Sequence, residues 1–421
     1  MSATFSERLQ AEFAASRDRL PIDVLPLDQR HDALQALAGL GLPGLRDDAW
    51  RYANWRPLQT ARLQPGERLE SPADVAAVLA RLATPAEGTL RLVFVGGRLD
   101  ASSSSTDGAV LIPLPAPAFA SRRGEQRFAL LNDIFATDAA RFRVARDCAV
   151  EIVFIASATS YPRVELEFAA GVHATVVERH VAGTGPEEAL LVSAVTAFDL
   201  ERDVQLRHAR LQDLPADATH VESLQVRVQS GARFESVQLQ LGGGAVRSTI
   251  GCELLGRGSS AEVDVASLAD GNRTLDTTLK IDHLAEDTQS RQELRAVAAD
   301  RSHVAFQSYV TMDSRARGAD SRQSLKGLIG GAGAEVNLRP QLEIDVDSVR
   351  ASHGATTGAI DEAMLFYLLS RGLDRETARQ LLEWAFIETV IGRVSQPALR
   401  REFEERIVAR LGNRAALEAL A

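Results

Sequence analysis

Between residues 89 and 350 the sequence is a long succession of short segments in which apolar and polar residues alternate. Examples are CAVEIVFIA, RVELEFAAGVHATVVERHV and HVESLQVRVQSGARFESVQLQLG. A period of two places successive side chains on opposite faces, as in a β-strand with one buried face. Small-residue turns such as AAGVHA, QSGARF, GRGSSA and GAGAEV separate these segments at intervals of about 25 to 35 residues. The central region is therefore predicted to be β-structure.

The spacing of the turns leaves the architecture of this region open. Turns that recur at such intervals are typical of the coils of a parallel β-helix. Short antiparallel strands in a sandwich or barrel would give a similar pattern. The hexapeptide repeat of left-handed β-helices is absent from the sequence.

Helical patterns lie on both sides of the β region. Before it, apolar residues recur at helical spacing, as in Val75, Val78 and Leu79. After it, Asp361 stands at the start of one predicted helix, Asp374 caps the next, and Pro397 opens a third. We therefore expect an N-terminal helical region (1–88), a β core (89–350) and a C-terminal helical domain (351–421).

Composition and charge exclude several classes of protein. The net charge of −10 is spread among interspersed acids and bases, which argues against binding to nucleic acid. No stretch approaches the roughly 18 unbroken apolar residues that a membrane span requires, so membrane insertion is not expected. The first residues lack the apolar core of a secretory signal, which predicts a cytoplasmic protein.

The motifs of common enzymes are missing or lack their context. No G-x-x-x-x-G-K-[ST] or G-x-S-x-G occurs, so the chain is not expected to be an ATPase or a serine hydrolase. Parallel β-helices also serve as carbohydrate-active enzymes, which use acidic pairs and aromatic rings in a groove. The acids Glu343, Asp345 and Asp347 alternate, but a solvated face explains them as well. We keep such an enzyme as the alternative, with no catalytic residue assigned.

His353 is the histidine with the most distinctive position. It follows the last strand-like run and precedes an apolar helix, with Gly354 and Ala355 leaving space beside it. An imidazole there could be a solvated side chain, or could face a partner or a site for a soft metal. The two cysteines, Cys148 and Cys252, form no C-x-x-C pair and are fewer than the four thiolates usual for an iron–sulfur cluster.

The second C-terminal helix is predicted to be amphipathic. Its apolar stripe is Ala378, Leu381, Leu382, Ala385, Phe386, Thr389 and Val390. Packing against the strands or a neighbouring helix is the ordinary explanation of such a stripe, and docking of another protein is the second.

Two segments carry a resemblance to a known family. These are GLPGLRDDAWRYANWRPL near the start and LRPQLEIDVDSVRASHGATTGAIDEAMLFYLLSRGL near the end. The chain resembles, over nearly its full length, the SufB/SufD family of subunits of the SufBCD complex for iron–sulfur cluster assembly. The histidine followed by glycine is similar to the SufD branch, since SufB usually has glutamate there.

The resemblance implies a fold, partners and a function. It implies a mainly β protein with a right-handed parallel β-helix between two helical regions. It further implies a non-catalytic scaffold that pairs with SufB, forms a transient iron–sulfur cluster at their interface and docks the SufC ATPase. Reduced flavin is associated with the family's complex, and the isolated chain could pair with a second copy of itself.

The same resemblance implies roles for particular residues. The histidine matching His353 would bind iron or the nascent cluster, together with ligands from the partner chain. Tyr367, Arg371, Leu382 and Phe386 would lie in the region that docks SufC. Many relatives have a cysteine where this chain has Ala351, so a role for that thiol is absent here. A purely structural adaptor without metal contact is a further alternative.

Overall fold

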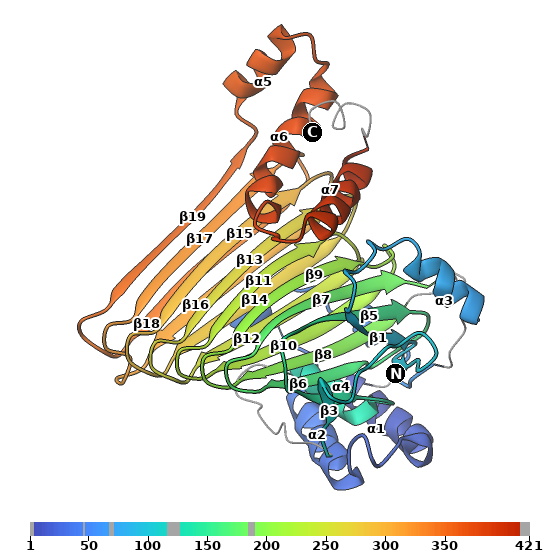
Figure 1. Cartoon of the computed structure of the whole chain (residues 1–421). Helices are drawn as coiled ribbons and strands as arrows, with labels where there is room; N and C mark the ends of the chain where they lie inside the picture. The colour runs from blue at the N-terminus through green and yellow to red at the C-terminus, as the bar shows by residue number, and fades with distance from the viewer. Residues whose placement is uncertain (1–3, 45–46, 67–70, 116–126, 184–189, 413–421) are drawn as a thin grey trace.

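A computed structural model describes residues 4–44, 47–66, 71–115, 127–183 and 190–412 of the chain, and its centre is a parallel β-helix (Figure 1). The chain alternates between two sheets, so each turn of the β-helix adds one strand to each sheet. Sheet A has the order β19-β17-β15-β13-β11-β9-β7-β5-β1-β2, and sheet B has the order β18-β16-β14-β12-β10-β8-β6-β4-β3. The long strands pair in parallel, which decides against an antiparallel sandwich or barrel.

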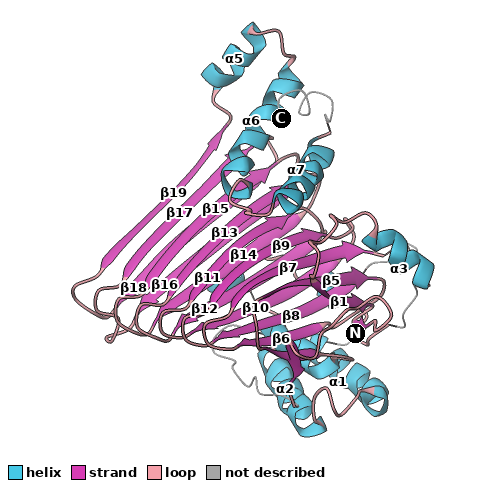
Figure 2. Cartoon of the chain, in the orientation of Figure 1, coloured by secondary structure: helices cyan, strands magenta, loops and turns pink. Residues whose placement is uncertain are grey.

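The strands of the β-helix are mostly nine or ten residues long, and Figure 2 shows how they stack. Sheet A contains β1 (Leu90–Val95), β2 (Arg98–Leu99), β5 (Cys148–Ala156), β7 (His173–Ala182), β9 (Gln205–Asp213), β11 (Arg233–Gln240), β13 (Ser260–Ala269), β15 (Gln289–Ala298), β17 (Asp320–Ile329) and β19 (Arg350–Ala359). Sheet B contains β3 (Leu111–Pro113), β4 (Ala140–Val144), β6 (Arg163–Phe168), β8 (Leu191–Leu200), β10 (Thr219–Val228), β12 (Ala245–Leu254), β14 (Thr274–His283), β16 (His303–Met312) and β18 (Glu335–Ile344).

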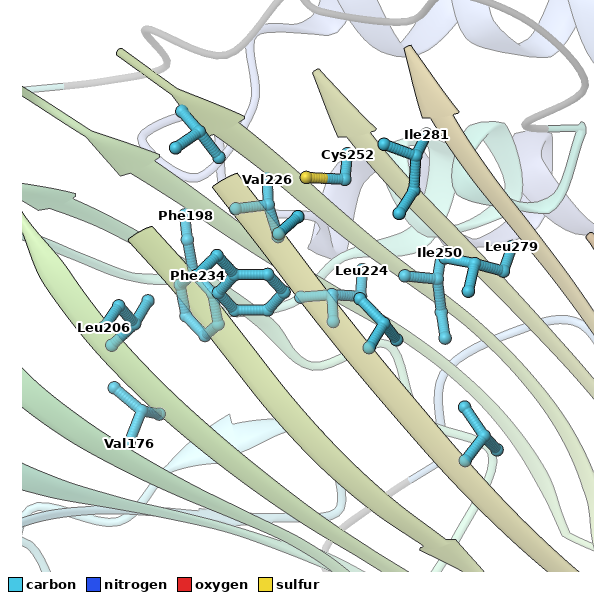
Figure 3. Packing of buried hydrophobic residues seen from close by; sticks show 14 of the residues in the cluster. Val176, Phe198, Leu206, Leu224, Val226, Phe234, Ile250, Cys252, Leu279 and Ile281 are labelled. Carbon is cyan, nitrogen blue, oxygen red and sulfur yellow. The ribbon is translucent and has the colours of Figure 1, made fainter. Parts of the chain in front are cut away.

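Alternate side chains of every strand point into the space between the two sheets, here called the lumen. Leu224, Ile250 and Leu279 form one row across three strands of sheet B, and a second row contains Val226, Cys252 and Ile281 (Figure 3). All six side chains are at most 1% exposed. Stacking similar apolar side chains in register removes them from water together, so these rows form the main core.

One series of turns, each leading from sheet B to sheet A, explains the loose repeat in the sequence. In every successive turn one residue has a positive φ: Gly171, Asp203, Gly231, Gly258, Asp287, Gly318 and Ser348. Backbone hydrogen bonds join neighbouring turns, as between Gly231 N and Arg257 O (3.1 Å). Glycine adopts this left-handed conformation without strain, and aspartate tolerates it better than most residues. The repeat is degenerate because three of the seven positions do not use glycine.

Two of the N-terminal helices lie over the outer face of sheet B, and the third packs against β1, β5 and β7 on the outer face of sheet A. They are α1 (Phe5–Ser16), α2 (Leu27–Leu40) and α3 (Pro72–Leu79), and short 3₁₀ turns lie between them. The capping boxes Thr4–Glu7 and Ser71–Asp74 start α1 and α3. The connector around Trp50 is packed as expected, since this ring is 3% exposed and lies 4.9 Å from Trp55.

A further helix, α4 (Arg127–Phe135), lies inside the region that we expected to be strands. It packs between α2 and strands β8 and β10. Eight of its nine residues are buried, so it has no polar face and shows no helical period in the sequence.

The C-terminal helices are α5 (Glu362–Ser370), α6 (Arg375–Ile391) and α7 (Pro397–Leu411). The side chains of Asp361 and Asp374 accept hydrogen bonds from the first turns of α5 and α6, as the sequence predicted. Helices α6 and α7 cover the outer face of sheet A, whereas α5 projects beyond the sheets (Figure 1). The β-helix itself ends later than predicted, because β19 runs past residue 350 to Ala359. In the described part of the chain no helix has the length and apolarity to cross a membrane.

Candidate functional site

The two ends of the β-helix differ in how they are closed. At the first end, β2 and β3 pair antiparallel with β1 and β4 and terminate both sheets. At the other end, β18 pairs only with β16 and β19 only with β17 among the described strands, so each has a free edge. All ten residues of β19 are exposed. Two long uncovered edges side by side are the arrangement to which another chain can add strands.

His353 lies in the middle of β19, in register with Gln323 of β17. We expected this histidine between a strand and a helix, but it is within the last strand itself. The segment RASHGATTGA has no alternation of apolar residues and contains two glycines, so its own strand propensity is low. It is a strand because β17 offers an edge for it to pair with.

The register places His353 on the lumen-facing row of sheet A. Gln323 on that row donates from Nε2 to Ser308 Oγ (2.7 Å), and this hydroxyl donates to Gln292. Within the described structure, the imidazole of His353 itself makes no hydrogen bond or ion pair, and a Cβ added at Gly354 would meet nothing within 4 Å. The ring is therefore accessible to a group brought by another molecule.

The chain's two thiols cannot assist His353 directly. Cys252 is 1% exposed in the lumen core, and Cys148 is at the start of β5 near the other end of sheet A. Burial, helped by Asp147, raises the pKa of Cys148 to about 11, and burial also raises the pKa of Cys252. Both remain protonated at neutral pH, whereas metals bind the thiolate. Ala351 lies on the same face of β19, two residues before His353, but supplies no ligand atom.

The acids considered for a carbohydrate enzyme do not form a pair along one strand. Strand β18 ends at Ile344, so only Glu343 belongs to it, and Asp345 and Asp347 lie in the following turn. All three are exposed, in agreement with a solvated face.

The apolar stripe predicted for α6 is only partly used for packing inside the chain. Ala378 and Val390 are buried, whereas Leu382 and Phe386 are half-buried. The ring of Phe386 packs against the α6–sheet A cluster, and the Arg295 guanidinium lies 4.9 Å from its centre. The packing explanation therefore accounts for part of this stripe.

Helix α5 presents a more exposed apolar surface, here called the α5 patch: Met364, Phe366 and Tyr367, which are 57%, 71% and 55% exposed. The Arg371 guanidinium lies 5.1 Å from the Tyr367 ring centre, so these two predicted residues are close together. Met364 and Phe366 were missed because AMLFYLL is apolar almost throughout, and a sequence cannot tell which face of such a helix is covered.

Comparisons with known proteins give a consistent result. Residues 153–386 match the family model described as "SUF system FeS cluster assembly, SufBD core domain". The chain is 27% identical over 405 residues to the iron–sulfur cluster assembly protein SufD of Escherichia coli, covering 92% of both chains. A SufBD family protein of Synechocystis is 22% identical over 420 residues, again with 92% of both chains covered. The chloroplastic ABCI7 protein of Arabidopsis thaliana is 30% identical over 57% of this chain and 51% of its own length.

Proposed function

Since this chain belongs to the SufBD family and has a role in iron–sulfur cluster assembly, we propose that it is a non-catalytic scaffold subunit whose open end pairs with a SufB-like chain. The main support for the proposal is the position of His353 on the free edge of β19. A cluster would be the cargo of this site. It would be held by the imidazole on one side and by partner ligands on the other.

The edges of β18 and β19 support pairing with another β-helix. Both edge strands are ten residues long, and a partner with matching edges would continue both sheets across the interface. The half-buried Leu338 and Leu342 and the exposed Ile344 lie on the lumen-facing row of β18 and would be covered by the same contact. A second copy of this chain has the same edges, which supports homodimer formation when the SufB-like chain is missing.

The chemistry of the open end supports transient binding of metal. Imidazole nitrogen binds iron, and the other ligands of a cluster are usually thiolates, which this chain does not supply there. Cluster formation would therefore require the second subunit. Fewer thiolate ligands would make the cluster easier to release to an acceptor.

The C-terminal helices supply the surface that we assign to a SufC-like ATPase. The α5 patch is apolar and exposed, and Arg371 lies beside it. Leu382 and Phe386 on α6 would contribute their exposed parts. We propose reduced flavin as a component of the whole complex. No described residue of this chain is assigned to bind it.

The decisive experiment is His353→Ala in the complex co-expressed with SufB-like and SufC-like subunits. The assembled complex should form, while its iron content and cluster yield fall at least about tenfold, as expected when a ligand is removed. His173→Ala is the matched control, because His173 is exposed on β7, far along sheet A. Unchanged iron in the His353 variant would leave the structural adaptor as the function. Failure to co-purify with either subunit would reject the proposal.

Amide hydrogen exchange tests the pairing separately from the metal. In the isolated chain at low concentration, the outward-facing amides of β18 and β19 should exchange quickly. Binding of the SufB-like chain should slow this exchange, whereas exchange in β2 and β3 at the closed end should not change. Equal exchange in both states would place the interface elsewhere.

A further inference from the structure

A cluster of histidine, glutamate and arginine side chains lies buried in the lumen, far from the open end. Glu178 and His180 point inward from β7, His208 and Arg210 from β9, and His220 and Glu222 from β10. These six residues, here called the lumen cluster, are all at most 3% exposed. Strands β7 and β9 belong to sheet A and β10 belongs to sheet B, so the cluster joins the two sheets across the core.

Arg210 pairs with both carboxylates but uses only one oxygen of each. Its Nη2 lies 3.0 Å from Glu178 Oε1, and its Nη1 lies 3.0 Å from Glu222 Oε1. Glu178 Oε1 is also 2.6 Å from His180 Nε2 and accepts a hydrogen bond from Thr196 Oγ1 (3.2 Å). Glu178 is therefore well surrounded by donors, whereas Oε2 of Glu222 lies 3.8 Å from the Nε2 atoms of both His180 and His220.

His220 is the least satisfied member of the lumen cluster. Neither of its ring nitrogens makes a hydrogen bond within the described residues, although the side chain is fully buried. Its ring centre is 4.8 Å from that of His180, whose Nδ1 is also without a hydrogen-bond partner in that part of the chain. In a neutral imidazole one of the two ring nitrogens carries a lone pair, which can bind a cation. Burying such nitrogens without a partner is unfavourable.

The charge of the lumen cluster also calls for a cation. Two carboxylates and one guanidinium leave a net charge of −1 when the three imidazoles are neutral. A buried charge without a counter-charge is strongly unfavourable, so the interior must hold either a proton on an imidazole or a bound cation. A bound ion would use one nitrogen of His220 together with His180 and Glu222.

We propose that His180, His220 and Glu222 bind one divalent transition-metal ion of the imidazole-preferring class, such as Zn²⁺, which links sheet A to sheet B inside the β-helix. One ligand atom from each residue lies within 4.8 Å of the others. A tetrahedral ion with bonds of about 2.0 to 2.1 Å separates its ligands by roughly 3.4 Å, so small side-chain rotations close the site. Two imidazoles and one carboxylate are a ligand set that Zn²⁺ and Fe²⁺ accept.

This ion is distinct from the iron handled at the open end. Six strand spacings of about 4.8 Å separate β7 from β19, which places the two sites roughly 30 Å apart. Because the lumen cluster is fully enclosed, the ion would enter as the chain folds and exchange slowly afterwards. Its role would be structural, and the proposal does not depend on the function of His353.

The test is metal analysis of the untagged full chain, produced with Zn²⁺ in the medium and then dialysed against a chelator. Wild-type protein should retain one ion per chain by elemental analysis and native mass spectrometry. Glu222→Gln, which preserves shape and removes a charged ligand, should lower retention at least about tenfold. Refolding with Co²⁺ should give the visible absorption of a tetrahedral site in wild-type protein and not in this variant.

Two controls distinguish the lumen cluster from other histidines. His283→Gln should retain the ion, because His283 is equally buried but donates to or accepts from Thr288 Oγ1 (2.8 Å) and Ser290 Oγ (2.9 Å). His353→Ala should also retain it, even where that change abolishes cluster yield. If wild-type protein retained no metal and gave no Co²⁺ spectrum, the proposal would be overturned. A proton on one imidazole would then balance the charge of the lumen cluster. Full retention in Glu222→Gln would overturn the assigned ligands.

Discussion

His353 on β19 and Gln323 on β17 are paired in register, so the exposed imidazole continues a row of side chains that is buried in the preceding turns. Gln323 is 3% exposed and hydrogen-bonded, whereas His353 is exposed and without a partner in the described chain. The same row thus changes from core to surface within one strand spacing. A partner that covers β19 would turn His353 into the innermost residue of an interface.

The lumen core should dominate the stability of the chain. Phe234→Ala removes a ring that is fully buried, so we expect the free energy of unfolding to fall by about 3 to 5 kcal/mol. Phe366→Ala is the matched control, because that ring is 71% exposed and its loss should cost less than about 0.5 kcal/mol. Chemical denaturation of both variants measures the difference. Similar losses would mean that α5 is packed against the body in solution.

A buried ion pair should hold α7 on sheet A. Arg179 of β7 lies 2.7 Å from Glu402 of α7 and 2.5 Å from Glu151 of β5, and all three are at most 5% exposed. Arg179→Met leaves both carboxylates buried without this cation, so stability should fall by about 3 to 5 kcal/mol. Hydrogen exchange should show α7 opening first. Arg202→Ala, which breaks an exposed pair with Asp203, should change stability by less than about 1 kcal/mol.

His283 should make the chain less stable in mild acid. Burial lowers its pKa from 6.5 to about 4, so the unfolded chain takes up a proton on this residue before the folded chain does. Its contribution is therefore complete above about pH 6.5 and is lost as the pH falls towards 4. Between pH 7 and pH 5 this one site should remove about 2 kcal/mol from the free energy of unfolding.

Denaturation curves of His283→Gln at the two pH values measure this part of the acid sensitivity. The variant should lose about 2 kcal/mol less than wild-type protein over the interval. His173→Gln, at an exposed position on β7, should follow wild-type protein. An unchanged pH dependence in His283→Gln would mean that this ring takes up a proton as readily in the folded chain as in the unfolded chain.

The α5 patch should control binding of the SufC-like ATPase. Replacing Phe366 with alanine removes the most exposed large apolar side chain of the patch, and we expect the affinity to fall at least about tenfold. Ile22→Ala is the control, since Ile22 is 68% exposed among the N-terminal helices. Titration calorimetry with the purified ATPase compares the two. If both variants bound the ATPase with the same affinity, the docking surface would lie on α6 and not on the α5 patch.

The sequence predicted the elements that depend on local pattern. Strand segments such as Ser223–Val228 of β10 and Ser260–Val265 of β13 alternate between polar and apolar residues, and turns with Gly171, Gly231 and Gly258 use the residue that their backbone conformation favours. The cap Asp374 was also found from sequence, and Asp361 was placed at the start of its helix. The order of helix, strand and helix regions followed from these features, and the parallel β-helix then followed from the resemblance to the SufB/SufD family.

The features that sequence missed depend on contacts between distant segments. Strand β19 forms by pairing with the edge of β17. Helix α4 gives no helical pattern in the sequence because nearly all of its residues are buried. The lumen cluster was missed because His180 and His220 come from different sheets. A signal was nevertheless present: E-x-H at Glu178 and H-x-E at His220 place both polar side chains of each pair on one face of a strand.

The ladder of positive-φ turns restricts how the length of this protein can change. Register between neighbouring coils advances by 26 residues from Thr219 to Ala245, by 29 from Ala245 to Thr274 and by 32 from His303 to Glu335, so the connecting turns absorb the differences in length. One residue inserted within β13 would exchange its inward and outward side chains and carry the carboxylate of Asp264 into the apolar interior. Gain or loss of a complete coil preserves every stacked turn. Related proteins with this architecture should therefore differ in the length of the β-helix by whole coils.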